Sequence, residues 1–354
     1  MTNIEKYQSL LNDEVDGLLL TSRFSRHYAA RYDIAEGVAV VTKAGCRYFT
    51  DSRYIESAQS GIEGFEVLIM DRDHPYSQRI NDAIRDFGIT NLGYEECYLT
   101  VAEFMSYENK LEAKLVPVSG KLAAFRAVKE PYELERMRKA QEITDAAFAD
   151  VLPRIKVGMT EKELCAELIY CLMKNGGEGL SFEPIVVSGP NTSLPHGVPG
   201  DRRIQEGDFI TMDFGVIYQG YCSDMTRTVA MGYATREMKR VYDTVLEAQL
   251  AGIAATKAGV TGKEIDAAAR QVITDAGYGL YFGHGYGHSL GLEVHESPNC
   301  SPMCQEPIPE NAVCSAEPGI YLPGKFGVRI EDVVVFTKDG CEILTASPKN
   351  LIIL

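Results

Sequence analysis

Two aspartates, Asp213 and Asp224, lie in an otherwise apolar, strand-like stretch of the sequence. We expect this stretch to form a β-hairpin with its turn near Tyr218–Gly220. A two-residue turn at Tyr218-Gln219 would place Asp213 directly opposite Asp224. Facing residues on paired strands have Cβ atoms about 4.5–5.5 Å apart. Two carboxylates at that distance repel each other unless a proton or a cation lies between them. The alternative, two solvated aspartates beside a loop, is disfavoured by the apolar surroundings.

A second pair of carboxylates, Glu317 and Glu331, lies in a similar setting, because apolar segments flank a loop around Gly324. A hairpin centred on Gly324 brings Glu317 opposite Glu331, and strand alternation puts Arg329 on the same face as Glu331. Four carboxylates that converge on one axis cannot all remain ionised without compensating charge. Divalent cations are the simplest compensation.

Four of the six histidines lie beside these carboxylates. His196 is in a loop before the first pair, whereas His284, His288 and His295 lie within one Gly-rich stretch. A lone histidine is usually solvated or hydrogen-bonded, but three in a loop that lets backbone approach closely favour a functional site. Oxygen ligands with one or two imidazoles suit Mn²⁺, Co²⁺, Zn²⁺ or Fe²⁺. Bridging carboxylates fit two-metal hydrolysis, with the ions about 3.5–4 Å apart.

The elements that position these side chains come from an internal repeat. Residues 156–164 match residues 257–265 at a constant offset of 101 positions. Both copies contain Thr-x-x-Glu, a capping box that predicts the start of a helix. A longer helical pattern precedes each copy, at 131–155 and 235–257. The repeat predicts two similar halves around a pseudo-twofold axis, with any site between them.

The segment before the repeat has the pattern of a separate α/β domain, a sheet covered by helices. Its apolar runs predict strands at 17–20, 37–41 and 65–70, and its polar periodic segments predict helices at 3–13, 52–60 and 75–87. Pro131 opens the next helical pattern at a favoured first-turn position. We therefore predict two domains, residues 1–125 and 126–354.

Composition excludes several classes of function. The chain has 354 residues with 50 acidic and 35 basic side chains, a formal net charge of −15. This surplus disfavours nucleic acid and anionic membranes as partners, since both attract Lys and Arg. No apolar run approaches the roughly 20 residues of a spanning helix, and the first residues lack a signal-peptide pattern. Nine scattered cysteines, with Cys300 and Cys304 read as ordinary thiols, favour a reducing, cytoplasmic setting.

The chain resembles the pita-bread metallopeptidases, which include methionine aminopeptidases, aminopeptidase P and prolidase. The motifs are an Asp-x₁₀-Asp pair at 213 and 224, Gly-x-Gly-His-x₂-Gly-Leu-x₂-His-Glu at 285–296, Ala-Glu-Pro-Gly at 316–319 and Arg-Ile-Glu-Asp at 329–332. Asp51-Ser52-Arg53-Tyr54 and Gly93-Tyr94-Glu95-Glu96 resemble the creatinase/prolidase N-terminal domain, which methionine aminopeptidases lack. The resemblance therefore implies an α/β N-terminal domain, an α+β pita-bread catalytic domain and a function in the proline-directed branch.

The resemblance implies a role for each candidate residue. The metal ligands are Asp213, Asp224, His288, Glu317 and Glu331. Glu317 is also the proton acceptor and donor, while His196 and His295 contact the substrate carbonyl and the developing oxyanion. His284, Arg329 and Tyr321 join His295 in binding substrate. The implied cofactors are two divalent ions, with Mn²⁺ as the first choice and Co²⁺, Zn²⁺ or Fe²⁺ as alternatives.

The implied reaction is hydrolysis of the bond between an N-terminal residue and proline, in short peptides with proline second, by a homodimer. The sequence leaves open whether the chain is an Xaa-Pro aminopeptidase or an Xaa-Pro dipeptidase. Two alternatives are an aminopeptidase of broader N-terminal specificity and a non-catalytic pita-bread binding protein. The complete set of five ligands disfavours the binding protein, which has no need to retain them.

Overall fold

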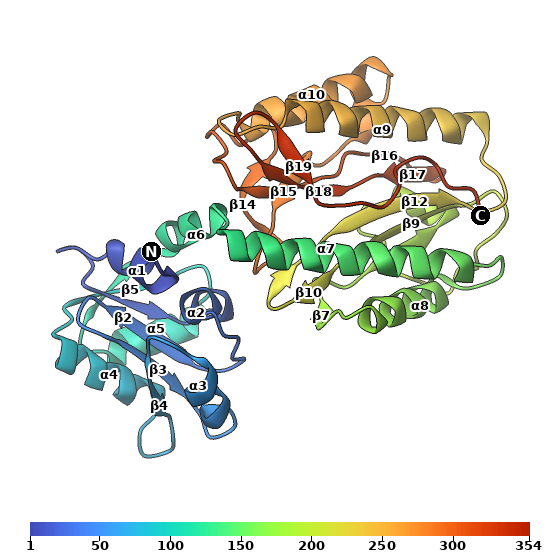
Figure 1. The fold of residues 1–354 in the computed structure, drawn as a ribbon. Coiled ribbons are helices and arrows are strands. Elements are labelled where there is room, and N and C mark those ends of the chain that lie inside the picture. The colour runs from blue at the N-terminus through green and yellow to red at the C-terminus, as the bar shows by residue number, and fades with distance from the viewer. The chain divides into compact units, whose positions relative to one another are not determined.

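The chain, described over residues 1–354 by a computed structural model, divides into two units between Arg126 and Ala127 (Figure 1). The elements of the first unit are α1 (Asn3–Ser9), β1 (Gly17–Leu20), α2 (Arg23–Ala30), β2 (Val38–Thr42), β3 (Cys46–Thr50), α3 (Ile55–Gly61), β4 (Glu66–Ile69), α4 (Tyr76–Phe87), β5 (Asn91–Tyr94), α5 (Val101–Lys110), β6 (Lys114–Pro117) and α6 (Ser119–Ala127).

The first unit contains a six-stranded mixed sheet in the order β4-β3-β2-β1-β5-β6. Apolar side chains of β1, β2, β3 and β5 pack against α4 to form its core. The predicted sheet with covering helices is confirmed, as are the predicted strands at β1, β2 and β4. Strand β3, where polar and apolar residues mix, and the short strand β5 were not predicted.

The second unit has two long helix pairs and several small sheets. Its helices are α7 (Pro131–Val151), α8 (Glu161–Lys174), α9 (Arg236–Ala255) and α10 (Gly262–Asp275), with 3₁₀ turns η1 (Leu152–Arg154), η2 (Gly189–Ser193) and η3 (Gly279–Tyr281). Its strands are β7 (Gly179–Leu180), β8 (Ile185–Ser188), β9 (Phe209–Phe214), β10 (Val216–Tyr218), β11 (Tyr221–Cys222), β12 (Met225–Ala230), β13 (Gly287–Ser289), β14 (Glu296–Cys300), β15 (Val313–Ala316), β16 (Gly319–Leu322), β17 (Phe326–Arg329), β18 (Asp332–Phe336) and β19 (Cys341–Ile343).

The internal repeat predicted from the sequence is visible in this unit. Helices α8 and α10 both begin after a threonine cap, and Thr160–Glu163 and Thr261–Glu264 form complete capping boxes. The ends of the two helices keep the offset of 101 positions. Figure 1 shows α7 and α8 on one side of the strands and α9 and α10 on the other. Helices α7 and α8 pack an apolar core against β8, β9, β10 and β12, whereas α9 and α10 pack against β15 to β18 and the outer ends of β9 and β12.

The turn of the first hairpin lies within the predicted region, Tyr218–Gly220, but one residue beyond the two-residue turn at Tyr218-Gln219. Tyr218 pairs with Tyr221, so the turn residues are Gln219 and Gly220 rather than Tyr218 and Gln219. Both turn residues have positive φ, 46° for Gln219 and 84° for Gly220. The favoured two-residue hairpin turn requires positive φ at both central positions, which glycine adopts without steric cost. The predicted turn region is therefore correct, and only the two-residue turn at Tyr218-Gln219 is wrong, because it leaves Gly220 outside the turn.

The shifted turn changes the register of the carboxylates but not their face. Asp213 of β9 pairs with Thr226 of β12, and Asp224 lies two residues before Thr226. The predicted direct opposition of Asp213 and Asp224 is therefore wrong. Because side chains alternate with a period of two, a two-residue shift leaves both carboxylates on one face of the hairpin.

The second hairpin has the predicted centre. Strand β16 pairs with β17, and β15 pairs with β18, in one continuous register about Gly324. Glu317 follows β15 and Glu331 precedes β18, so both lie in the gap between these two ladders. Gly324 has φ of 72°, which places the turn at the predicted position.

No helix in the chain combines the length and the apolar character that crossing a bilayer requires.

Candidate metal centre

Every candidate site residue proposed from the sequence lines one cavity of about 880 Å³ in the second unit. These residues are Asp213, Asp224, His288, Glu317, Glu331, His196, His284, His295, Tyr321 and Arg329. They come from both halves of the repeat. Asp213 is on β9 and Asp224 directly precedes β12, whereas His288 is on β13, Glu317 directly follows β15 and Glu331 directly precedes β18. The predicted position between the two halves is therefore the position of the cavity.

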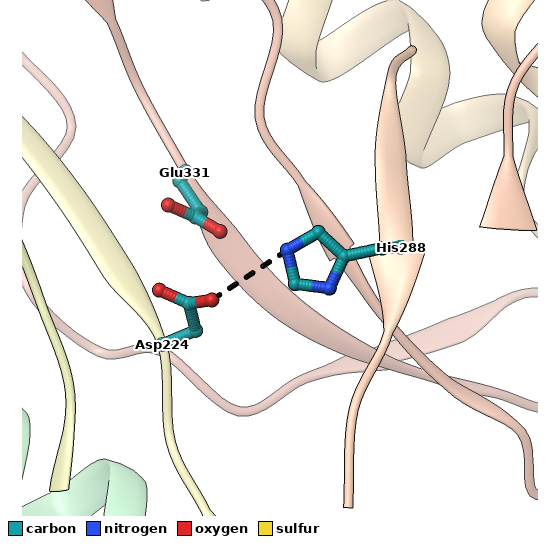
Figure 2. A group of neighbouring side chains, drawn as sticks. All are labelled: Asp224, His288 and Glu331. Carbon is teal, nitrogen blue, oxygen red and sulfur yellow. Dashed lines mark ion pairs between the residues drawn. The ribbon is translucent and has the colours of Figure 1, made fainter. Parts of the chain in front are cut away.

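Asp224, His288 and Glu331 form the centre of this cluster. One ligand atom from each residue lies within 4.8 Å of the others, and Figure 2 shows the three side chains pointing toward one another. The distance between His288 Nε2 and Asp224 Oδ2 is 3.7 Å. Two carboxylates and an imidazole at this spacing are a donor set that suits a transition-metal cation.

Glu317 and Asp213 complete the cluster on its two sides. Glu317 Oε1 lies 3.3 Å from His288 Nε2 and accepts a hydrogen bond from Ser315 Oγ at 3.0 Å. Asp213 Oδ2 accepts a hydrogen bond from Arg329 Nη2 at 2.5 Å, and both side chains are largely buried. The five proposed ligands therefore line one cavity.

The carboxylates carry more negative charge than the protein compensates. The Oδ1 atoms of Asp213 and Asp224 are buried without a hydrogen-bond partner. Burial raises the pKa of Asp224 and of Glu331 well above the ordinary carboxyl value, and the neighbouring carboxylates raise both pKa values further. Burial also raises the pKa of Glu317. Buried, unpartnered acceptors that repel one another fit a cation-binding centre. A bound cation offsets both the cost of burying acceptors without partners and the repulsion between the carboxylates.

The tautomer and the neutral charge of His288 leave Nε2 able to act as a ligand. Its Nδ1 lies 3.2 Å from the carbonyl oxygen of Ser289, which can only accept, so the proton is on Nδ1. Burial lowers the pKa of His288, which keeps the ring neutral. A Cβ at Gly287 would lie 2.0 Å from the Ser315 carbonyl oxygen, so glycine alone lets β13 approach β15 closely enough to place this ring. The free lone pair of Nε2 therefore faces the carboxylates.

A buried chain of hydrogen bonds links Arg329 to the cavity wall. Besides Asp213, the guanidinium donates to Tyr321 Oη at 2.9 Å and to Thr226 Oγ1 at 3.0 Å. Tyr321 Oη in turn lies 2.9 Å from His284 Nε2, and His284 Nδ1 lies 2.8 Å from the Gly285 carbonyl oxygen. Since that carbonyl accepts from Nδ1, Tyr321 donates to Nε2. Arg329 and His284 are thus already engaged within the protein.

His196 and His295 differ from the other histidines because both are exposed at the cavity. The His295 ring lies 4.3 Å from the His288 ring, centroid to centroid. Burial and the neighbouring His288 lower the pKa of His295, so its ring is neutral near pH 7. These two side chains are therefore placed to meet a molecule that enters the cavity beside the carboxylate cluster.

Sequence reasoning missed two hydroxyl groups at the site. Thr226 Oγ1 donates to Glu331 Oε2 at 2.6 Å. Ser315 Oγ donates to Glu317 Oε1 and accepts from the backbone N–H of His288. Each hydroxyl lies two residues from a candidate ligand, Asp224 or Glu317, and therefore on the same strand face. Alternation around the carboxylates was the signal that could have found them.

The raised carboxyl pKa values predict that cation binding releases protons. In the metal-free protein, Asp224, Glu317 and Glu331 hold protons at a pH where exposed carboxyls are ionised. Affinity for Mn²⁺ should therefore increase with pH, about tenfold per pH unit for each proton displaced, and level off above the raised pKa values. The stability that these groups give the metal-free protein is present at low pH and lost as pH rises through the raised pKa values.

Calorimetric titration with Mn²⁺ in buffers of different ionisation enthalpy measures this proton release directly. His288 adds no proton, because burial already keeps it neutral. Affinity independent of pH between about pH 5 and about pH 8, with no proton release, would contradict the charge distribution described here.

Comparison with known proteins places the chain in a family. Its sequence matches metallopeptidase family M24 over residues 135–338 and the creatinase/prolidase N-terminal domain over residues 4–128. The Xaa-Pro dipeptidase of Pyrococcus horikoshii is 40% identical over 267 residues, 75% of this chain and 76% of that protein.

Two solved structures cover nearly the whole chain. An Xaa-Pro dipeptidase from Bacillus anthracis is 40% identical with a TM-score of 0.96, covering 99% of both chains. An X-Pro aminopeptidase from Thermotoga maritima is 37% identical with a TM-score of 0.93, covering 100% of both chains. The two-domain architecture expected from the motifs is confirmed. The chain belongs to metallopeptidase family M24 and carries the creatinase/prolidase N-terminal domain.

Proposed function

We propose that the chain is a metal-dependent exopeptidase that hydrolyses the bond between an N-terminal residue and proline. The observation that carries this proposal is the buried cluster of four carboxylates and one imidazole that lines a substrate-sized cavity in an M24 metallopeptidase. Relatives named Xaa-Pro dipeptidase and X-Pro aminopeptidase support the specificity for proline.

Asp213, Asp224, His288, Glu317 and Glu331 would hold two divalent cations, with Mn²⁺ as our first choice. The unpartnered Oδ1 atoms of both aspartates and the Nε2 lone pair of His288 are the free donors at this position. Such cations, when bound, lower the pKa of a water molecule and polarise a carbonyl group. Protein groups must supply the remaining work: orienting the peptide, stabilising the oxyanion and moving a proton.

Glu317 is the group that we assign to proton transfer. Burial raises its pKa, and Ser315 Oγ fixes one of its carboxylate oxygens. A carboxyl with a raised pKa is suited both to accept a proton near neutral pH and to return it. The leaving nitrogen of an Xaa-Pro bond belongs to the pyrrolidine ring and needs that proton.

His196 and His295 are assigned to the substrate carbonyl. Both are exposed at the cavity, and a neutral imidazole can present an N–H to an oxygen that becomes negative. Arg329, Tyr321 and His284 form the wall behind them, where their mutual hydrogen bonds hold each side chain in one orientation. In this role Arg329 acts through Asp213, and His284 presents its ring to the prolyl residue.

Preference for proline has to come from contacts other than an amide hydrogen, because an Xaa-Pro bond has no N–H. The cavity offers an apolar wall for the pyrrolidine ring and for the preceding side chain. This wall consists of Phe182, Pro184, Ile185, Pro195, Val198 and Val294. A pyrrolidine ring that packs against these apolar side chains gains binding energy that a smaller residue lacks.

The test compares matched peptides on metal-stripped protein reloaded with Mn²⁺. We expect Xaa-Pro dipeptides to be cleaved at least about tenfold faster than Xaa-Ala dipeptides. Cleavage of dipeptides alone identifies a dipeptidase, whereas cleavage of Xaa-Pro-Yaa tripeptides identifies an aminopeptidase. Absence of turnover with every peptide, despite bound Mn²⁺, would refute the proposal and favour a binding protein.

We also propose that the chain acts in the cytoplasm as a homodimer. All nine cysteines are free, which is typical of proteins in reducing compartments. The family resemblance supports the dimer. Light scattering of the purified protein measures the mass directly, and a mass of one chain, 39.1 kDa, would contradict the dimer.

A further inference from the structure

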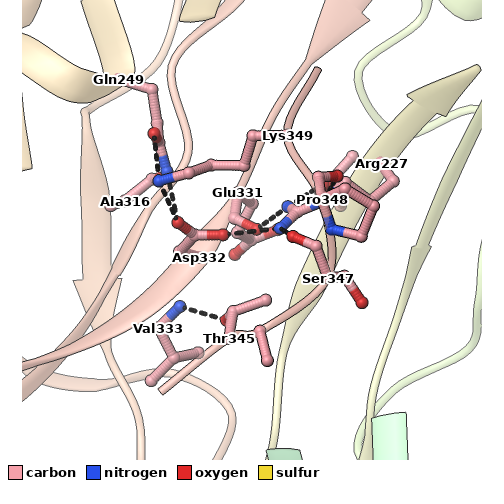
Figure 3. Close-up of polar contacts among 12 residues, drawn as sticks. Arg227, Gln249, Ala316, Glu331, Asp332, Val333, Thr345, Ser347, Pro348 and Lys349 are labelled. Carbon is pink, nitrogen blue, oxygen red and sulfur yellow. Dashed lines mark hydrogen bonds and ion pairs between the residues drawn. The ribbon is translucent and has the colours of Figure 1, made fainter. Parts of the chain in front are cut away.

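A buried ion pair lies behind the carboxylate cluster, on the opposite strand face. Asp332 follows Glu331 directly, so alternation directs its side chain away from the cavity. Its Oδ1 lies 2.8 Å from Arg227 Nη2, with exposed side-chain fractions of 0% and 1%. Figure 3 shows this pair at the centre of a set of polar contacts. Burial of two charges is costly unless further hydrogen bonds satisfy them.

Arg227 donates hydrogen bonds to the backbone of residues at the metal site. Its Nη1 donates to the carbonyl oxygens of Glu331 at 2.5 Å and of Thr226 at 3.0 Å. Thr226 is the residue whose hydroxyl holds the Glu331 carboxylate, and Glu331 N–H also donates to the Thr226 carbonyl at 3.1 Å. The guanidinium therefore fixes the peptide groups on both sides of the Thr226–Glu331 contact.

The second carboxylate oxygen of Asp332 extends the contacts toward Glu317. It lies 2.8 Å from Lys349 Nζ and accepts from Gln249 Nε2 at 3.0 Å. Gln249 Nε2 also lies 3.5 Å from the carbonyl oxygen of Ala316, the residue before Glu317. Ala316 and Asp332 pair across β15 and β18. The contacts thus reach the backbone beside both glutamates of the cluster.

Residues 345–349 complete this set of polar contacts. Arg227 donates to the carbonyl oxygens of Ser347 at 2.8 Å and Pro348 at 3.1 Å. Asp145 of α7 accepts from Ser347 N–H at 2.8 Å, and Thr345 Oγ1 accepts from Val333 N–H at 3.0 Å. This segment is therefore anchored to a helix of one half and to a strand of the other.

We propose that Arg227, Asp332 and Lys349 form a positioning network that holds Glu331 and Glu317 at the spacing that divalent cations require. The inference rests on the proposed metal centre. The glutamates repel each other, and cation binding demands donor positions within a few tenths of an ångström. A rigid charged network behind their backbone opposes their separation. Loss of a supporting group of this kind typically costs about 10–100-fold in metal affinity.

Lys349→Met is the variant that tests the network with the least risk to the fold. The Lys349 side chain is 21% exposed, and methionine keeps most of its length while removing the ammonium group that pairs with Asp332. Lys349→Arg restores a cation at the same position. Lys325→Met is the matched control, because Lys325 pairs with Glu237 at 3.0 Å on the exposed surface, away from the cavity.

We expect Lys349→Met to weaken Mn²⁺ binding about 10–100-fold, as measured by calorimetry on metal-stripped protein, with Lys349→Arg recovering most of the loss. Lys325→Met should bind Mn²⁺ like the wild type. Asp332→Asn, a neutral isostere, should weaken binding at least as much as Lys349→Met does.

The result that would overturn the inference differs from the result that would refute the proposed function. If Lys349→Met and Asp332→Asn lower the Tm of the metal-free protein while the folded protein binds Mn²⁺ with wild-type affinity, the network is purely structural and the inference is overturned. Wild-type protein that binds Mn²⁺ but cleaves no peptide refutes the proposed function instead. The affinity comparison still decides the inference in that case, because it does not depend on turnover.

Discussion

Replacing Asp224 by asparagine is expected to abolish hydrolysis and to raise the thermal stability of the metal-free protein. Asp224 is 3% exposed, its Oδ1 has no hydrogen-bond partner, and burial beside Asp213 and Glu317 raises its pKa. Asparagine keeps the shape and cannot ionise, so it avoids the buried charge that Asp224 acquires as pH rises through its raised pKa. It also removes a proposed ligand, so the loss of activity should exceed the roughly 10–100-fold typical of changes outside the ligand shell.

Two measurements on one protein preparation check this prediction. Calorimetric scans of metal-stripped protein should give a higher Tm for Asp224→Asn than for the wild type, whereas peptide hydrolysis with added Mn²⁺ should vanish. Asp150→Asn is the matched control: Asp150 pairs with Lys174 at 3.1 Å on the surface, so activity should stay unchanged. Retained turnover in Asp224→Asn would overturn the assignment of the metal centre.

Replacing Arg329 by methionine is expected to destabilise the metal-free protein by about 3–5 kcal/mol, because it leaves a buried carboxylate without its partner. Arg329 is 4% exposed and is bonded to Asp213, Thr226 and Tyr321. Nearby Tyr321 and Asp213 raise the Arg329 pKa well above its ordinary value despite burial, so the guanidinium is charged at every accessible pH. Activity should fall as well, since Asp213 loses its orientation.

A double-mutant cycle separates this pair from its surroundings. Adding Asp213→Asn to Arg329→Met removes the stranded charge, so the double variant should be more stable than Arg329→Met alone. Chemical denaturation of the four metal-free proteins gives the coupling between the two side chains. Strictly additive effects would show that the Arg329–Asp213 contact at 2.5 Å contributes nothing specific to stability.

Local patterns in the sequence were sufficient for the elements of the repeat and for one of the hairpins. Each capping box is completed by residues only three positions apart, so Thr160 and Thr261 mark the beginnings of α8 and α10 without any tertiary information. Gly324 likewise determines the centre of its hairpin, because the turn needs positive φ there. Alternation along the strands then predicted which side chains share a face with each carboxylate.

The register of the first hairpin could not be obtained in this way. A shift of two residues leaves every side chain on the same face, so the apolar pattern fits both registers equally well. The choice was made by the turn, where Gly220 takes the second central position. Asp213 consequently faces Thr226 rather than Asp224, and Thr226 becomes the group that holds the Glu331 carboxylate.

The sequence by itself determined the carboxylates, the imidazoles and the two-fold plan that brings them together, because these follow from residue type and short-range periodicity. Only the tertiary structure decided what supports them. Arg227 lies more than a hundred positions before Asp332 and Lys349, and no local pattern predicts their contact. Their pairing arises from the burial of charge in a folded core, where each ion needs a specific partner and only packing shows which one is in reach.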